Sequence, residues 1–158
     1  RLDEGMQSLA EVIKKTTGKD ITNYPGAGAA GGMGGGLLAF FNAELKPGTE
    51  LLLKAIDFSE KIKGADLIIT GEGKADQQTA MGKVPYGILK EAQKEHIPVI
   101  VLAGSIENLP ELNKAGFKGI FSIAPGPITL EKAMEPEFAK ENITRLVSQL
   151  YSVITSFG

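Results

Sequence analysis

A polar segment with the composition of a reaction or binding site follows a short apolar run near the middle of the chain. The apolar run, residues 66–70, is rich in isoleucine and is typical of a strand buried on both faces of a parallel sheet. Beyond it, charged and hydroxyl side chains gather among three glycines. These side chains belong to Glu72, Lys74, Asp76, Thr79 and Lys83. Because open α/β sheets bind ligands beyond the carboxyl ends of their strands, we interpret the segment as a site.

The residue types in this segment suit the handling of phosphate. Lys83 precedes a predicted helix, where an ammonium group would join free backbone amides and the helix dipole. Glu72 and Asp76 could hold Mg²⁺, which takes one or two carboxylates and completes its shell with water and phosphate oxygens. Alternatively, Asp76 could accept a proton from a substrate hydroxyl, or the charges could be ordinary solvated loop side chains. The segment is not a P-loop, since Gln77 replaces the first glycine and Val84 replaces the hydroxyl residue.

A second candidate segment, residues 26–36, contains seven glycines. The spacing of Gly26, Gly28 and Gly31 matches the dinucleotide fingerprint, but a proline precedes the first glycine and Glu44 lies in a loop after a helical run. The glycines could instead let a helix pack closely against another backbone. They could also expose amides at a helix start to a phosphate or a carboxylate. We favour this last interpretation.

The order of predicted elements indicates an α/β fold. Strands are expected at 66–70, 98–103 and 119–123, and helices near 84–95, 110–116, 130–134 and 136–155. This alternation predicts a parallel sheet with right-handed crossovers. Residues 1–64 show helical patterns but no convincing central strand. We therefore predict a Rossmann-like, three-layer domain over residues 65–158 and assign residues 1–64 to part of a second α/β domain.

Composition excludes several classes of protein. The 158 residues suit one domain, or one domain and part of another. Seventeen basic and nineteen acidic residues give a net charge of −2, which argues against nucleic acid as a partner. No apolar run approaches the ~18–20 residues of a membrane span. The lack of cysteine, with a single histidine, argues against a zinc site and fits a reducing cytoplasm. The chain begins inside a predicted helix, so we expect a fragment of a longer protein.

Four separated motifs, in the same order, resemble the bacterial glycerate kinase family. They are residues 25–32, the stretch Thr70-Gly71-Glu72-Gly73 with Asp76, Gln78, Thr79, Gly82 and Lys83, the stretch Ala103-Gly104-Ser105, and residues 121–127. The resemblance covers essentially the entire chain. It implies ATP-dependent phosphoryl transfer to a hydroxyl of glycerate with Mg²⁺, giving a phosphoglycerate. It also implies a Rossmann-like domain beside a flavodoxin-like domain, with the active site between them.

Members of this family are considerably longer, so the chain resembles their C-terminal portion and is not expected to be active without the remainder of the parent enzyme. Glu72, Asp76 and Lys83 are the expected catalytic residues, with Mg²⁺ on Glu72 or Asp76. The expected substrate- and phosphate-binding residues are Gly26, Gly28, Gly31, Gly71, Gly73, Gln78, Thr79 and Gly82. The sequence leaves open whether the protein forms a homo-oligomer. The alternatives are a nucleotide- or dinucleotide-binding module with other chemistry and a non-catalytic binding domain.

Overall fold

The computed structural model describes residues 2–107 and 109–156. The chain forms two compact units, Arg1–Gly48 and Thr49–Gly158. The contacts place the boundary earlier than the sequence-based one at residues 64/65, because the two helices before the sheet cluster with it. The assignment of the two parts to different domains of a longer enzyme stays a prediction.

The first unit packs helix α1 (Leu2–Thr17) against helix α2 (Ala29–Phe41). Its small core consists of Ala10, Ile13, Ile21 and Ala39. The start of α2 is irregular, because residues 30–32 have φ angles of 51°, 66° and 93°. Gly34 and Gly35 serve close packing, since a Cβ on Gly34 would collide with the Gly26 carbonyl oxygen and one on Gly35 would lie 2.6 Å from Ile21 Cδ1.

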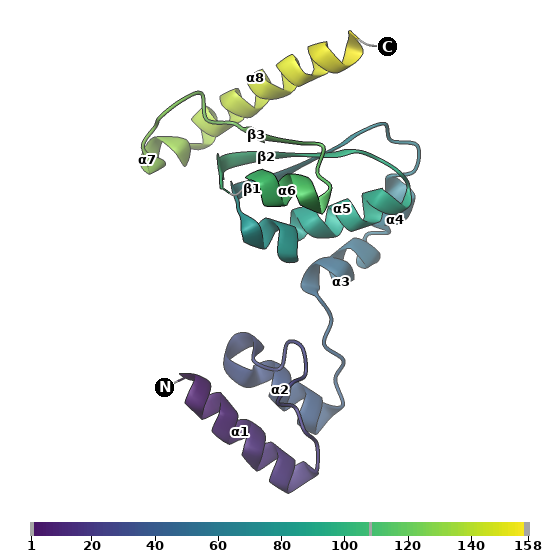
Figure 1. The fold of residues 1–158 in the computed structure, drawn as a ribbon, viewed down its shortest axis with the longest axis vertical. Helices are drawn as coiled ribbons and strands as arrows, with labels where there is room; N and C mark the ends of the chain where they lie inside the picture. Colours follow the sequence, from purple (N-terminus) through teal and green to yellow (C-terminus); the bar gives the residue numbers. More distant parts are fainter. Residues whose placement is uncertain (1, 108, 157–158) are drawn as a thin grey trace. The chain divides into compact units, whose positions relative to one another are not determined.

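The second unit is a parallel sheet between helices (Figure 1). Its strands, in sheet order, are β1 (Ile68–Ala75), β2 (Val99–Ile106) and β3 (Gly119–Ser122). Its helices are α3 (Gly48–Ala55), α4 (Phe58–Lys61), the 3₁₀ helix η1 (Gln77–Met81), α5 (Val84–Lys94), α6 (Leu109–Ala115), α7 (Leu130–Ala133) and α8 (Pro136–Thr155). Helices α5 and α6 lie on one face of the sheet and α8 on the other (Figure 1), which confirms the predicted α/β class.

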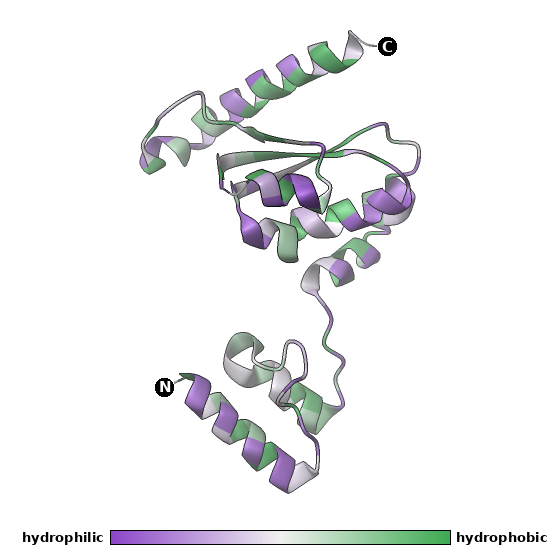
Figure 2. Cartoon of the chain, in the orientation of Figure 1, coloured by the Kyte–Doolittle hydropathy of each residue, from purple (hydrophilic) through white to green (hydrophobic). Residues whose placement is uncertain are grey.

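The core of this unit lies between the sheet and helices α5 and α6. Val99, Val101 and Ala103 alternate along β2 and are buried against Leu89 of α5 and Leu112 of α6. Alternate strand residues point to one face, so the intervening residues of β2 face α8. Figure 2 shows green and pale segments along the strands and alternating green and purple segments along α8. Among the described helices, none has the length and apolar character that crossing a membrane requires.

Strand β1 is longer than predicted. Gly71, Glu72 and Lys74, expected in a loop, pair with Leu102, Ala103 and Ser105 of β2. The prediction of a loop from residue 71 was wrong because main-chain pairing with a buried neighbour outweighs the low β-propensity of glycine. Close approach of the two backbones also needs a glycine at position 104, where a Cβ would lie 2.7 Å from the Gly73 carbonyl oxygen. Glu72 and Lys74 therefore lie on a rigid strand.

Candidate functional site

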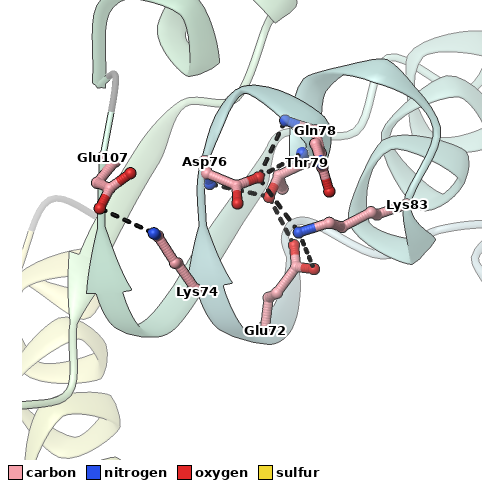
Figure 3. A network of polar contacts seen from close by, with 7 residues as sticks. All are labelled: Glu72, Lys74, Asp76, Gln78, Thr79, Lys83 and Glu107. Carbon is pink, nitrogen blue, oxygen red and sulfur yellow. Dashed lines mark hydrogen bonds and ion pairs between the residues drawn. The ribbon is translucent and has the colours of Figure 1, made fainter.

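The ammonium group of Lys83 lies between two carboxylates at the end of β1 (Figure 3). Its Nζ is 3.2 Å from Oε1 of Glu72 and 3.2 Å from Oδ1 of Asp76. Glu72 comes from β1, Asp76 precedes η1, and Lys83 is the N-cap of α5. Their side chains are 16%, 22% and 32% exposed, respectively, so the pairs are partly shielded from water yet open to a ligand. The structure thus brings together the three residues expected to be catalytic.

Thr79 forms hydrogen bonds with both acidic residues, Glu72 and Asp76. Its hydroxyl donates a hydrogen bond of 2.8 Å to Oε2 of Glu72 and accepts one of 3.1 Å from the backbone N–H of Asp76. The backbone N–H groups of Gln78 and Thr79 donate to Oδ1 of Asp76, at 2.9 and 3.3 Å. This reciprocal capping box fixes the first turn of η1. As a result, the strand end and the 3₁₀ helix form one hydrogen-bonded corner.

The charges of this corner reinforce one another. Burial acts to raise the pKa of the Asp76 carboxyl, but the hydrogen bonds from Lys83 and from the backbone, together with the Lys83 charge, hold it below its ordinary value. Burial likewise acts to lower the pKa of Lys83, but hydrogen bonds and attraction to Asp76 and Glu72 raise it above its ordinary value. Asp76 is therefore an anion and Lys83 a cation throughout the neutral range.

The other residues predicted for this segment surround the three charged side chains, and their binding role stays a prediction. Thr79 is fully buried and its hydroxyl is engaged, so it offers no group to a ligand in this arrangement. Gly71 and Gly73 belong to β1, and Gly82 closes η1 with a φ of 142°. Gln78 contributes its backbone N–H to Asp76 while its residue is exposed.

The start of α5 offers fewer amides than the sequence suggested. Pro85 has no N–H, and the N–H groups of Tyr86 and Gly87 donate to the carbonyl of Lys83. The positive charge at this helix start is therefore chiefly the Lys83 ammonium group.

The glycines expected to bind phosphate or carboxylate in the first unit lie around the start of α2. Gly26 has a φ of 86°, Gly28 is the N-cap, and Gly31 has a φ of 66°. A shallow hollow of about 180 Å³ between α1 and α2 is lined by Gly28 and Gly32 with mainly apolar neighbours. The binding role of Gly26, Gly28 and Gly31 stays a prediction.

One ion pair near the site was not foreseen. Lys74 Nζ lies 2.8 Å from Glu107 Oε1, across the ends of β1 and β2 (Figure 3). Glu107 directly follows β2, so its place beyond a predicted strand was the available signal. Both side chains are at least half exposed, and the pair is separate from the Lys83 corner.

The residues fit a magnesium ion held mostly by phosphate and water. Glu72 has both carboxylate oxygens engaged, whereas no hydrogen bond to Oδ2 of Asp76 is found among the described residues. One carboxylate is enough for Mg²⁺ in a nucleotide site. Within residues 2–107 and 109–156, no cluster of three or more potential metal ligands occurs. Asp76 is accordingly the better of the two predicted ligands, and Glu72 could serve only if Lys83 moved.

The fold and the site define the class of the protein: an α/β protein with a charged, partly buried site at the carboxyl ends of parallel strands, where such folds bind ligands. Comparison with known proteins makes this class specific. The chain belongs to the glycerate kinase family, whose sequence profile matches residues 1–155.

Relatives of known name agree with this assignment. The chain is 45% identical over 135 residues to a glycerate kinase of Halalkalibacterium halodurans, covering 85% of the chain and 36% of that protein. It is 43% identical over 145 residues to the glycerate 2-kinase of Escherichia coli K12, covering 91% of the chain and 38% of the relative. A crystal structure from Salmonella typhimurium LT2, described as a glycerate kinase 2, superposes with a TM-score of 0.68 at 33% identity, covering 95% of this chain and 37% of that one.

The chain thus spans well under half the length of the relatives it matches. The sequence-based resemblance to glycerate kinases is confirmed along nearly the whole chain.

Proposed function

We propose that the full-length protein is a kinase that transfers a phosphoryl group from ATP to a hydroxyl of glycerate, giving a phosphoglycerate. The observation that carries the proposal is the Lys83 ammonium group held between Glu72 and Asp76 at the end of a buried strand. Membership in the glycerate kinase family supports the choice of donor and acceptor. The substrate is accordingly a small organic acid, and the absence of cysteine fits a cytoplasmic enzyme.

In this proposal Lys83 neutralises negative charge on the transferring group. Phosphoryl transfer depends mostly on positioning and on electrostatic stabilisation of the three equatorial oxygens. A cation already fixed by two carboxylates needs little reorganisation when the charge on these oxygens shifts during transfer. The remaining N–H of the Lys83 ammonium group would donate to a phosphate oxygen while the other two stay directed at Glu72 and Asp76.

Asp76 would orient the attacking hydroxyl. Its Oδ2 faces no hydrogen-bond donor among the described residues, so it is the oxygen available to accept a hydrogen bond from the substrate. The lowered pKa of the carboxyl keeps it ionised, so that both of its oxygens act only as acceptors. Magnesium, when bound with ATP, would supply further charge neutralisation. Its protein ligand would be Asp76, as the alternative to the contact with the hydroxyl, or Glu72 if Lys83 moved.

The glycines would bind the remaining anionic groups. Backbone amides around Gly26, Gly28 and Gly31 would receive the carboxylate of glycerate or a phosphate. Gly82 directly precedes Lys83, Gln78 donates its backbone N–H to Asp76, and Gly71 and Gly73 flank Glu72 on β1. The backbone around these four residues would line the phosphate path.

A coupled assay of ADP release by the full-length protein with ATP and glycerate tests the proposal. We expect glycerate-dependent turnover, and a fall in kcat of about 10²-fold in Asp76→Asn, the loss typical of a positioned acid–base group. Asp66→Asn, an exposed aspartate before the same strand, is the matched control and should keep the parent rate. Absence of glycerate-dependent ADP release, or full activity of Asp76→Asn, would overturn the assignment.

A further inference from the structure

Thr79 is the most deeply placed member of the corner that carries Lys83. It is fully buried, and its hydroxyl spans two elements by donating to Glu72 of β1 and accepting from the backbone at the start of η1. A side chain with no exposed surface does not contact ATP or glycerate. Its two hydrogen bonds nevertheless determine where the Glu72 carboxylate lies (Figure 3).

We propose that Thr79 is a positioning residue, which acts on the reaction through Glu72 and then Lys83. This inference rests on the proposed phosphoryl transfer and extends it to residues that touch neither substrate. Thr79 holds Oε2 of Glu72, and the other oxygen of the same carboxylate holds the Lys83 ammonium group at 3.2 Å. In this arrangement Glu72 supports Lys83.

The physical reason lies in the mobility of the two charged side chains. Lysine has a flexible four-carbon stem, so its ammonium group is fixed only by what it binds. Glu72 is 16% exposed and, without the Thr79 hydroxyl, could turn toward water and release Lys83. A displacement of about 1 Å of a charge-stabilising group costs on the order of 10²-fold in rate. Loss of one buried hydroxyl can therefore reach the reaction without touching a ligand.

Kinetics of three variants of the full-length protein test this chain of contacts. Thr79→Val keeps the shape and removes the hydroxyl, whereas Thr79→Ser keeps the hydroxyl. Thr70→Val makes the same change at a buried threonine of β1 whose hydroxyl has no hydrogen bond among the described residues. We expect kcat to fall by about 10- to 100-fold in Thr79→Val with KM for glycerate little changed, and to stay within about threefold of the parent in Thr79→Ser and Thr70→Val. Parent kcat in Thr79→Val, or an equal loss in Thr79→Ser, overturns the proposal.

A second measurement does not depend on turnover and separates this inference from the proposed function. Competitive labelling with acetic anhydride, quantified by peptide mass spectrometry, reports how readily the reagent reaches and acylates the Lys83 amine. We expect faster labelling of Lys83 in Thr79→Val than in the parent, Thr79→Ser or Thr70→Val, because a released Glu72 no longer holds the amine between two carboxylates. If the parent lacks kinase activity, the proposed function is wrong. The labelling rates still show whether Thr79 holds Lys83 in place through Glu72. Unchanged labelling of Lys83 overturns the positioning role.

If Thr79→Val does not fold, a substitution of the partly exposed Glu72 tests the same chain of contacts. Glu72→Gln keeps an acceptor for the Thr79 hydroxyl but removes the charge that holds Lys83. We expect it to lower kcat by at least tenfold and to speed labelling of Lys83. A variant with parent kcat and parent labelling would show that Glu72 does not support Lys83.

Discussion

Lys83 carries the positive charge on which the proposed reaction depends most directly. Its replacement by alanine leaves Glu72 and Asp76 side by side with no cation between them. We expect Lys83→Ala to lower kcat by about 10²–10³-fold, as for a lost electrostatic stabiliser. Lys94→Ala on the same helix is the control, because Lys94 forms only a surface ion pair with Glu91. Steady-state kinetics of the full-length variants measure both, and unchanged turnover in Lys83→Ala would remove Lys83 from the site.

The same residues make a pH-dependent contribution to stability whose sign follows from the pKa shifts. The pKa of Asp76 is lowered below its ordinary value of 3.8, so its stabilisation is present above that pH and is lost as pH falls through the folded-state pKa. The pKa of Lys83 is raised above 10.5, so its stabilisation is present below that pH and is lost in more alkaline solution. Between these limits the ion pairs contribute constantly.

Acid unfolding of Asp76→Asn tests the lower limit. We expect the difference in unfolding free energy between parent and variant to be constant from about pH 5 to 9 and to shrink below about pH 4, because the parent alone loses an ionised carboxylate there. Urea unfolding at a series of pH values measures this. A difference that does not change with pH across the acid range would show that ionisation of Asp76 does not stabilise the fold.

At the scale of the elements, helix α2 contains glycines that close packing requires and glycines that it does not. A Cβ at Gly34 would meet the Gly26 carbonyl oxygen, which belongs to the backbone and cannot move cheaply, whereas nothing lies within 4 Å of a Cβ at Gly36. We expect Gly34→Ala to destabilise the protein by about 1–3 kcal/mol through overpacking. Gly36→Ala should be neutral or stabilising by roughly 0.5–1 kcal/mol, through better helix propensity. Urea or thermal unfolding compares the pair, and equal effects would contradict close packing at Gly34.

Element boundaries could be predicted where local chemistry dominates. Helix α8 begins and ends where Pro136 and the apolar spacing place it, since proline suits the first helical position. The length of β1 could not be predicted, because Gly71 and Gly73 favour loops locally and only pairing with β2 holds them in a strand. Tertiary pairing of this kind is absent from a local pattern.

The site could be predicted in composition but not in its internal arrangement. Charge and spacing were enough to select Glu72, Asp76 and Lys83, which the structure brings together. The burial of Thr79 and its hydrogen bond to Glu72, seven positions earlier, could not be predicted, because both depend on the 3₁₀ turn of η1. Hydroxyl side chains near phosphate-handling lysines look like ligand-binding groups until their burial is known.

For the whole molecule, the remaining choice is between an ATP-dependent kinase and a dinucleotide-binding protein. The spacing of Gly26, Gly28 and Gly31 permits both in principle, but the structure lacks the context of the fingerprint. The described residues before Gly26 form turns instead of a strand, and residues 30–32 are left-handed where the fingerprint starts a regular helix. Lys83 and its carboxylates, by contrast, suit a triphosphate with magnesium.

Ligand-dependent stability of the full-length protein decides between them. A ligand that binds only the folded state stabilises it by about 2.7 kcal/mol at a concentration of about 100 times Kd, which raises Tm by several degrees. We expect Mg²⁺-ATP to raise Tm and NAD to leave it unchanged, with the ATP-induced rise reduced in Lys83→Ala and retained in Lys94→Ala. An increase in Tm with NAD and none with ATP would instead favour dinucleotide binding. It would also show that the site around Lys83 does not bind the phosphates of ATP. Because Glu72 helps to hold the Lys83 ammonium group, the rise with ATP should also be smaller in Glu72→Gln, where that group is no longer held in place.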